Sequence, residues 1–297
     1  MNPIQLTNQY VIAVSGGVDS MTLLDLILKG TKNTDLIIVA HVDHNIRIDS
    51  GKDLQLVSRI SRKHNLKFYS THLNLEPHAS EEKARLGRYQ FLNEVVLNTG
   101  AEGLITAHHQ DDLIETILIN LIRGTNRKGL TSLASNHQIY RPLLNYSKKA
   151  ILSYALKNDL KWREDSTNKD TDYLRNYLRL QVLNKLQFNQ RRAILNISEN
   201  QKDLNRAIDT ILDNLYRLKI KNDRLDRLWF NAIDFKTQKE LLSYWLRRKG
   251  LREFNLKQIE RTVNYLKVAR SGAIIEVSKG YTFDIDKDYL ALRALER

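Results

Sequence analysis

Residues 15–20, Ser-Gly-Gly-Val-Asp-Ser, carry the clearest chemical pattern in the sequence. They follow the apolar run 11–14, which predicts a buried strand, and precede the apolar run 21–28, which predicts a helix. A strand, a glycine turn and a helix start form an anion site, because backbone N–H groups converge there and glycine lets a phosphate approach the main chain. Asp19 fits such a site if a divalent cation lies between its carboxylate and the phosphates. The alternative is an ordinary turn in which Asp19 or Ser20 caps the helix.

A second group of polar residues opens a predicted helix over residues 111–122. Asp112 and Glu115 are three positions apart and share one helix face, and His108 and His109 precede them. Such carboxylates can hold a cation, either Mg²⁺ or an ammonium group, and the histidines suit proton transfer or polarisation of a phosphate. The alternative is helix capping, since acidic side chains in a first turn complement the helix dipole.

Basic residues near these acids are candidates for binding anionic groups. Arg88, on a predicted helix over 81–98, offers a planar guanidinium to a carboxylate, so Arg88 and the acidic pair match the two ends of an amino acid. Two further groups, in a glycine-containing loop and on a later helix, suit phosphates: Arg123, Arg127, Lys128, Arg175 and Arg179. A solvated helix face and a plain surface loop are the alternatives.

These residues need a scaffold that brings distant turns together, and the hydrophobic pattern predicts one. Strands are predicted at 9–15, 35–43, 67–73, 103–108 and 139–144, and helices at 19–29, 50–64, 81–98 and 111–122. This alternation predicts an α/β fold with a five-stranded parallel, Rossmann-like sheet. Ligands of such sheets lie at the carboxyl ends of the strands, where the glycine turn, the polar run 41–47 and residues 107–112 are expected to meet.

The remainder of the chain is predicted to be mainly helical. Helices are expected at 148–158 and 173–186, followed by a long amphipathic helix over 191–218 and two or three short helices within 225–270. A hairpin at 272–277 and 281–286 and a last strand or helical turn at 289–295 complete the chain. We therefore expect a catalytic domain over 1–185, a linking helix over 186–216 and a smaller, mostly helical domain over 217–297.

Composition narrows the classes of partner and cofactor. The 297 residues carry a net charge of +13, and residues 186–297 hold 23 Lys and Arg against 15 Asp and Glu, which favours a polyanionic partner for the C-terminal part. The sequence has no cysteine, which excludes disulfides, cysteine-based zinc sites and iron–sulfur clusters. Without a signal peptide or an apolar run near 18 residues, we expect a cytoplasmic protein with no membrane partner.

Several ordered motifs between residues 11 and 180 resemble those of the tRNA(Ile)-lysidine synthase family, which belongs to the PP-loop ATP pyrophosphatases. They are 15–20, 41–47, 84–89, 107–116, 121–124, 141–144, and 165–168 with 175–179. The resemblance implies that ATP and Mg²⁺ bind the glycine turn and that O2 of the wobble cytidine of a CAU-anticodon tRNA(Ile) is adenylated. The ε-amine of free L-lysine then attacks C2 and AMP leaves.

The resemblance also implies roles for the candidate residues. ATP is expected to bind Ser15, Gly16, Gly17, Val18, Asp19, Ser20, His41 and Arg47, and the metal Asp19 and Asp43. Lysine is expected to bind Arg88, Asp112 and Glu115, with Asp19, His109 and Asp112 as catalytic residues. The tRNA and other phosphates are assigned to Arg123, Arg127, Lys128, Arg175 and Arg179. The sequence leaves open which residue deprotonates the amine and whether the chain forms a homodimer. The chain is also short for this family, in which many members carry a further C-terminal domain.

Other functions remain as alternatives. Related PP-loop enzymes thiolate tRNA or form amides, and thiolation through cysteine needs residues that this sequence lacks. A different class would be a non-catalytic tRNA-binding protein for which ATP is only a conformational ligand. Such a protein would release no pyrophosphate in the presence of tRNA and lysine.

Overall fold

The computed structural model describes residues 1–43, 51–73, 81–125, 127–135, 138–163, 174–251, 254–278 and 280–294. It divides into two compact units, the first comprising Met1–Thr125 and Gly129–Ser198 and the second Asn126–Lys128 and Glu199–Arg297. The functional division predicted at residues 185 and 216 stays a prediction.

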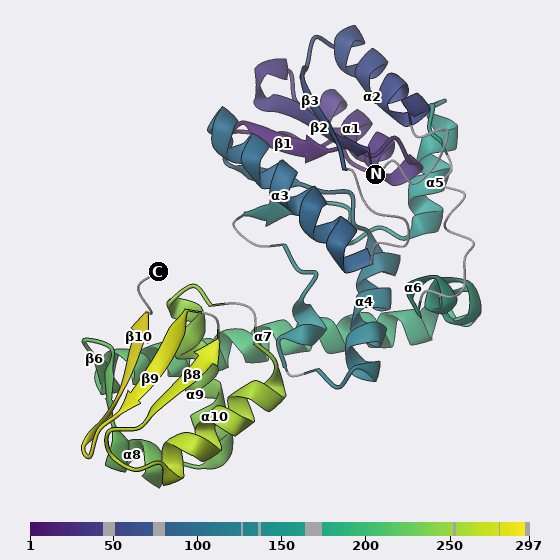
Figure 1. The fold of residues 1–297 in the computed structure, drawn as a ribbon. Helices are drawn as coiled ribbons and strands as arrows, with labels where there is room; N and C mark the ends of the chain where they lie inside the picture. The colour runs from purple at the N-terminus through teal and green to yellow at the C-terminus, as the bar shows by residue number, and fades with distance from the viewer. Residues whose placement is uncertain are drawn as a thin grey trace. The chain divides into compact units, whose positions relative to one another are not determined.

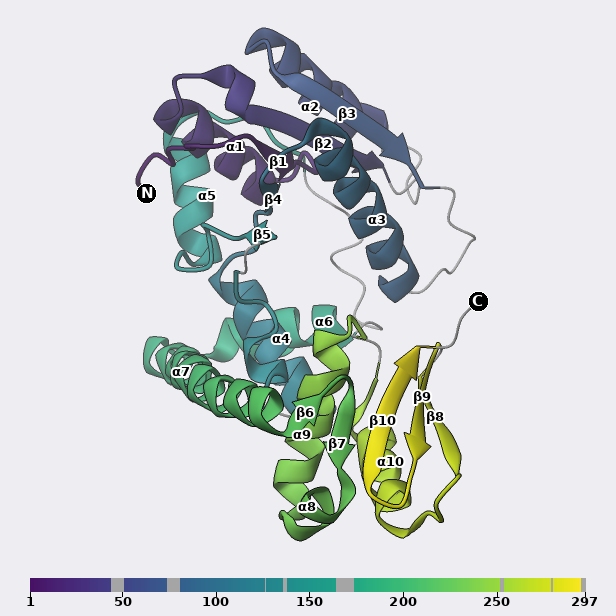
Figure 2. The same ribbon diagram turned by 90° about the vertical axis from the view of Figure 1, so that its left-hand side faces the viewer.

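The first unit is built on a parallel sheet. Its strands are β1 (Tyr10–Ala13), β2 (Ile37–Asp43), β3 (Lys67–His72), β4 (Gly103–Ile105) and β5 (Ile139–Tyr140). They pair in the order β3-β2-β1-β4-β5, and every pairing is parallel (Figures 1 and 2). The predicted five-stranded Rossmann-like sheet is confirmed. Its order reverses between β1 and β4, which is where open α/β sheets bind ligands.

Helices cover both faces of this sheet because neighbouring strand residues point to opposite sides. The helices are α1 (Val18–Gly30), α2 (Gly51–Lys63), α3 (Glu81–Thr99), α4 (Gln110–Ile122) and α5 (Lys148–Lys157). Ile12 packs with side chains of α1, α2 and α5, whereas its neighbour Val11 packs with α3 on the opposite face. Both strand residues are fully buried, and each contributes about 1.5–3 kcal/mol to stability by that burial.

Residues 174–198 form a helical layer against α4. The single helix predicted over 173–186 is wrong, because α6 (Leu174–Tyr177), a π-helical turn (Leu178–Val182) and a 3₁₀ turn (Leu183–Lys185) follow one another before α7 (Phe188–Lys219). Leu178 and Leu183 are five positions apart and both pack against Ile114 of α4. The π turn places residues at i and i+5 on one face, which an α-helix of 3.6 residues per turn does not.

The second unit combines helices with an antiparallel sheet. The helices are α8 (Arg227–Ala232), α9 (Phe235–Arg248) and α10 (Leu256–Val268), together with the end of α7. The strands, in the order β6-β7-β10-β9-β8, are Ile220–Lys221, Arg224–Asp226, Tyr289–Ala294, Tyr281–Ile285 and Ile274–Ser278. Fully buried Trp245 of α9 lies edge-on to Phe283 of β9, with ring centroids 5.2 Å apart.

The hairpin predicted near the C-terminus is confirmed as β8 and β9, but β6 and β7 were not predicted. They are joined by Asn222 and Asp223, with φ of 47° and 57°. Two consecutive left-handed residues are the requirement of a type I′ hairpin turn, so Asn-Asp was the available signal. No helix within the described ranges is both long and apolar enough to cross a membrane.

Candidate active site

Hydrogen bonds of the Ser15 and Ser20 hydroxyl groups stabilise the conformation of the glycine turn between β1 and α1. The Ser20 Oγ accepts a hydrogen bond from the Ser15 amide at 3.1 Å and donates to the Gly17 carbonyl at 3.0 Å. The Ser15 Oγ accepts from the Gly17 amide at 3.3 Å. Gly16 has φ of +90°, a conformation that L side chains rarely adopt. The turn is therefore preorganised as a concave main-chain surface of the kind that receives phosphate groups.

A cavity of about 350 Å³ opens at the carboxyl ends of β1, β2 and β4. One part of its lining comes from the glycine turn, through Ser15, Asp19 and Ser20. Arg88 of α3 and Asp112 of α4 line the same cavity, with Thr106 and His108 from the turn after β4. At the strand ends, as the sequence predicts, the anion-binding turn therefore lies beside the guanidinium of Arg88 and the carboxylate of Asp112, which come from two other helices.

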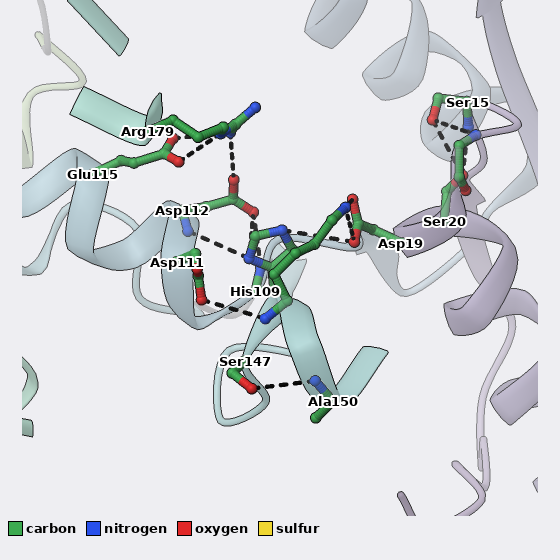
Figure 3. Close-up of polar contacts among 12 residues, drawn as sticks. Ser15, Asp19, Ser20, His109, Asp111, Asp112, Glu115, Ser147, Ala150 and Arg179 are labelled. Atoms are coloured by element: carbon green, nitrogen blue, oxygen red, sulfur yellow. Dashed lines mark hydrogen bonds and ion pairs between the residues drawn. The ribbon is translucent and has the colours of Figure 1, made fainter. Parts of the chain in front are cut away.

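The start of α4 carries a network of acidic and basic side chains, shown in Figure 3. His109 and Asp112 form a capping box, in which the His109 amide donates to Asp112 Oδ2 at 2.9 Å and the Asp112 amide donates to His109 Nδ1 at 3.4 Å. Arg179 donates to both oxygens of Glu115 at 2.7 and 2.9 Å and to Asp112 Oδ1 at 3.3 Å. Asp112 and Glu115, the two acids that were expected to bind lysine, thus bind Arg179, which was expected to bind phosphate.

Burial and charge set the ionisation of this network. Burial raises the pKa of Glu115, whose side chain is 1% exposed, although the hydrogen bonds from Arg179 oppose this effect. Burial also opposes ionisation of Asp112, but the neighbouring His109 and His108 outweigh it and lower the pKa of Asp112. Burial of Arg179 is likewise outweighed by its bonds to Glu115, which raise the pKa of the guanidinium. The pKa shifts of Arg179 and Asp112 therefore favour their charged forms, whereas burial of Glu115 disfavours its charge.

Asp19 is bound by a residue that the sequence analysis did not select. The Lys148 Nζ lies 2.7 Å from each carboxylate oxygen of Asp19. The His109 Nε2 lies 3.6 Å from Asp19 Oδ1. Lys148 is the first residue of α5, the helix that follows β5 in the chain. The rule that ligands lie beyond strand ends was the signal that could have identified Lys148.

A divalent cation fits Asp19 only if the nucleotide brings further ligands. Mg²⁺ in nucleotide sites is typically bound by one or two carboxylates and by substrate phosphates. Asp19 supplies one such carboxylate beside the anion-binding turn. No group of three or more His, Asp or Glu side chains able to hold a metal occurs in the described part of the chain. The residues present thus fit a cation shared with phosphates.

His108, one of the two histidines for which the sequence suggested proton transfer or polarisation of a phosphate, also lies at the site. Its Nδ1 lies 2.8 Å from the Thr106 hydroxyl, and its ring lines the cavity. Burial lowers the pKa of His108 to about 4, with nearby Arg141, Arg88 and Arg85 acting in the same direction against Asp112. His108 is therefore uncharged at neutral pH, and its ring presents a neutral imidazole to the cavity.

The residues expected to bind ATP and metal from β2 lie deeper than the turn. His41 is 2% exposed, and its Nδ1 lies 2.8 Å from the Val14 carbonyl, while burial lowers its pKa. Asp43 is also buried and lies 3.1 Å from His72 Nδ1. Neither residue belongs to the described lining of the cavity. Arg47 lies outside the described residues.

The basic residues assigned to phosphates occupy three different environments. Arg123 caps the carboxyl end of α4 and is exposed. The Arg175 Nε lies 4.0 Å from Glu115 Oε2, beside Arg179. In the second unit, Arg127 bonds to Asp209 at 2.8 Å and to Glu240 at 2.9 Å, and Lys128 bonds to Asp209 at 3.0 Å. With its side chain 12% exposed, Arg127 supports the structure of this unit.

The fold and the glycine turn define a class of protein, the α/β nucleotide-binding domains with a PP-loop. The PP-loop domain family matches residues 1–186, and the chain belongs to this family. It is 41% identical over 182 residues to a tRNA(Ile)-lysidine synthase of Enterococcus faecalis, covering 58% of this chain and 39% of that protein. It is 32% identical over 282 residues to a tRNA(Ile)-lysidine synthase of Thermosipho africanus, covering 90% of this chain and 63% of that protein. The matched region is thus less than two thirds of either relative's length.

A solved structure shares the fold. A U34-tRNA thiolase from Methanococcus maripaludis, determined with its [4Fe-4S] cluster, superposes with a TM-score of 0.56 at 18% identity, covering 68% of this chain and 72% of that one. Since this sequence has no cysteine, it supplies no thiolate for a comparable cluster. The likeness therefore concerns the fold alone.

Proposed function

We propose that this protein uses ATP to attach lysine to C2 of the wobble cytidine of a CAU-anticodon tRNA(Ile), forming lysidine, AMP and pyrophosphate through an adenylated tRNA. The observation that carries the proposal is the cavity that Ser15, Asp19 and Ser20 share with Arg88 and Asp112. An anion-binding turn beside a cation and an acid suits an enzyme that must bind a triphosphate and an amino acid together. The relatives named tRNA(Ile)-lysidine synthase support the identity of the substrates.

The chemistry assigns a task to each part of the cavity. The glycine turn would hold the triphosphate through backbone N–H groups, and Mg²⁺ held by Asp19 would neutralise phosphate charge. Arg88 would bind the carboxylate of lysine, and Asp112 one of its ammonium groups. Arg179 would act near the adenylated intermediate while Glu115 and Asp112 hold its guanidinium in place.

Lysine transfer would replace one bond to C2 by another. A deprotonated ε-amine would form the new C–N bond, and the C2–O bond would break with its electron pair leaving on the oxygen of AMP. The Asp112 and Glu115 carboxylates are engaged with Arg179, and His109 Nδ1 is engaged in the capping box. These engagements suit positioning better than proton removal, so His109 and Asp112 would act on the reaction by orienting Arg179 and Asp19.

The second unit would hold the tRNA. Residues 186–297 have a net charge of +8, with 23 Lys and Arg against 15 Asp and Glu, so affinity for the tRNA body should fall steeply with salt. A cytoplasmic location belongs to the same proposal, since tRNA and ATP are soluble substrates of that compartment.

The direct test is mass analysis of nucleosides from a CAU-anticodon tRNA(Ile) after incubation with ATP, Mg²⁺ and lysine. We expect cytidine at the wobble position to gain the mass change of lysine addition with loss of water, together with equimolar AMP and pyrophosphate. Release of ADP would refute the proposal, and so would unchanged nucleosides without pyrophosphate, which would indicate a tRNA-binding protein. Pyrophosphate release with another modified base would indicate a different PP-loop ligase.

A further inference from the structure

Lys148 neutralises the one carboxylate that the glycine turn places beside its anion site. Its Nζ is equidistant from both Asp19 oxygens, at 2.7 Å, so the contact has the geometry of a strong charge-assisted pair. Asp19 lies in the first turn of α1, and the cavity lining includes Asp19 together with Ser15 and Ser20. The ammonium group is thus at the edge of the proposed phosphate site.

Hydrogen bonds around the start of α5 and further along it fix the backbone of Lys148, whereas its side chain is partly exposed and is held by Asp19 at its end. The Ser147 hydroxyl caps α5 by accepting from the Ala150 amide at 3.2 Å, as Figure 3 shows, and the Lys148 amide donates to Asp111 Oδ1 at 3.3 Å. Further along α5, the Tyr154 hydroxyl donates to Asp25 of α1 at 2.8 Å. The side chain of Lys148 is nevertheless 42% exposed, so its four-carbon stem can take other rotamers.

Lys148 and a divalent cation cannot hold Asp19 in the same way. A Mg²⁺–carboxylate bond is about 2.0–2.1 Å long, and an ammonium 2.7 Å from both oxygens occupies the space in which that cation would bind. When nucleotide and cation arrive, the ammonium must leave at least one oxygen. The nearest new charge of opposite sign is then that of the phosphates.

We propose that Lys148 is a phosphate-binding residue that pairs with Asp19 in the nucleotide-free protein and transfers to the β- or γ-phosphate when ATP binds, where it would stabilise the departing pyrophosphate. Lys148 thereby keeps Asp19 neutralised and correctly oriented before the cation arrives. The inference rests on the proposed use of ATP at this turn, but it does not depend on which nucleobase or amine is the acceptor.

The test measures binding of inorganic pyrophosphate by calorimetry in the presence of EDTA, so that neither turnover nor metal contributes. The variants are Lys148→Met, Asp19→Asn and the double variant, with Lys149→Met as matched control, since the adjacent Lys149 is exposed. Lys148→Met should weaken pyrophosphate binding by about tenfold, the value of one charge-assisted hydrogen bond. Asp19→Asn should strengthen it, because the repulsion disappears and the ammonium is released, and Lys149→Met should leave it unchanged.

The double variant separates phosphate binding from a structural role. If Lys148 contacts phosphate, Lys148→Met should still weaken binding by about tenfold or more when introduced into Asp19→Asn. If Lys148 only supports Asp19, the substitution should have no effect in that background, and this result would overturn the inference. Lys148→Arg, which keeps the charge, should retain most of the affinity even if Lys148→Met folds poorly. A wild-type protein that binds pyrophosphate but forms no lysidine would reject the proposed reaction and leave this inference intact.

Discussion

Arg179 and Glu115 form an ion pair, and replacing Arg179 should lower the free energy of unfolding much more than replacing Glu115. The Glu115 side chain is 1% exposed and that of Arg179 is 34% exposed. Replacing Arg179 by Met leaves a buried carboxylate whose remaining cationic neighbour is Arg175 at 4.0 Å. Loss of one partner from a buried pair costs about 3–5 kcal/mol, and the partial exposure of Arg179 together with Arg175 places our expectation near the lower limit, at about 3 kcal/mol.

Glu115→Gln should cost much less. Burial raises the pKa of Glu115 despite the bonds from Arg179, so its ionised form carries a desolvation penalty in the folded protein that glutamine does not. Glutamine also keeps one acceptor oxygen for Arg179, which retains Asp112. We therefore expect Glu115→Gln to change the free energy of unfolding by less than about 1 kcal/mol. The double variant should recover most of the loss caused by Arg179→Met.

The measurement is urea unfolding of each variant followed by circular dichroism, with calorimetric Tm values at pH 7.5 and 5.0. A loss of 3 kcal/mol corresponds to a Tm lower by about 6–12 °C in a unit of this size. Without Arg179, the folded pKa of Glu115 rises further above its unfolded value near 4.3. Since the folded state then binds the proton more tightly, the loss should be complete only above the folded pKa and should shrink as pH falls toward the unfolded value.

Asp203→Asn is the control, because Asp203 and Arg206 form a pair whose side chains are 78% and 80% exposed. It should change stability by less than about 0.5 kcal/mol. Equal losses for Glu115→Gln and Arg179→Met, with the two effects additive, would contradict the reasoning, since burial of the carboxylate would then not be the dominant cost.

Three further outcomes are expected. NMR titration should find that the folded protein keeps His108 uncharged down to about pH 4, because burial lowers its pKa to that value. The histidine of an unfolded chain has a pKa near 6.5 and takes up the proton first, so His108 should lower stability progressively from about pH 6.5 to 4. A His108 that titrates near the unfolded value would exclude this. Arg88→Ala should raise the KM for lysine by about tenfold or more, while adenylation of the tRNA by ATP persists. Loss of the adenylation step instead would reject Arg88 as a lysine ligand. Gly16→Ala should weaken ATP binding and destabilise the protein by about 1–2 kcal/mol, because φ is +90° there. Gly51→Ala should do neither, since no atom of the described residues lies within 4 Å of the added methyl group. Retention of full ATP affinity by Gly16→Ala would show that the turn conformation is not required.

The sequence was sufficient to predict the scaffold of the first unit because the necessary information is local. Periodicity located each strand and helix to within a few residues, and the alternation of the two implied a parallel sheet. The rule that ligands lie at strand ends then predicted that the glycine turn lies near residues 107–112. The cavity agrees with this prediction, because Asp19 and Asp112 both line it. Shorter or irregular features were less accessible, as the β6–β7 hairpin and the π turn at Leu178–Val182 illustrate.

The ion pairs of the site depended on tertiary structure. Asp19 and Lys148 are 129 residues apart, and Glu115 and Arg179 are 64 apart, so no spacing within either segment indicates that they meet. Sequence alone treated Arg179 as a phosphate ligand and Glu115 as a lysine ligand, whereas packing of residues 174–185 against α4 pairs them with each other. Residue types and local order thus determined which chemistry the chain can support. Which charges neutralise one another was decided by the packing of helices, because a long-range ion pair depends on how far apart the folded backbone leaves two side chains.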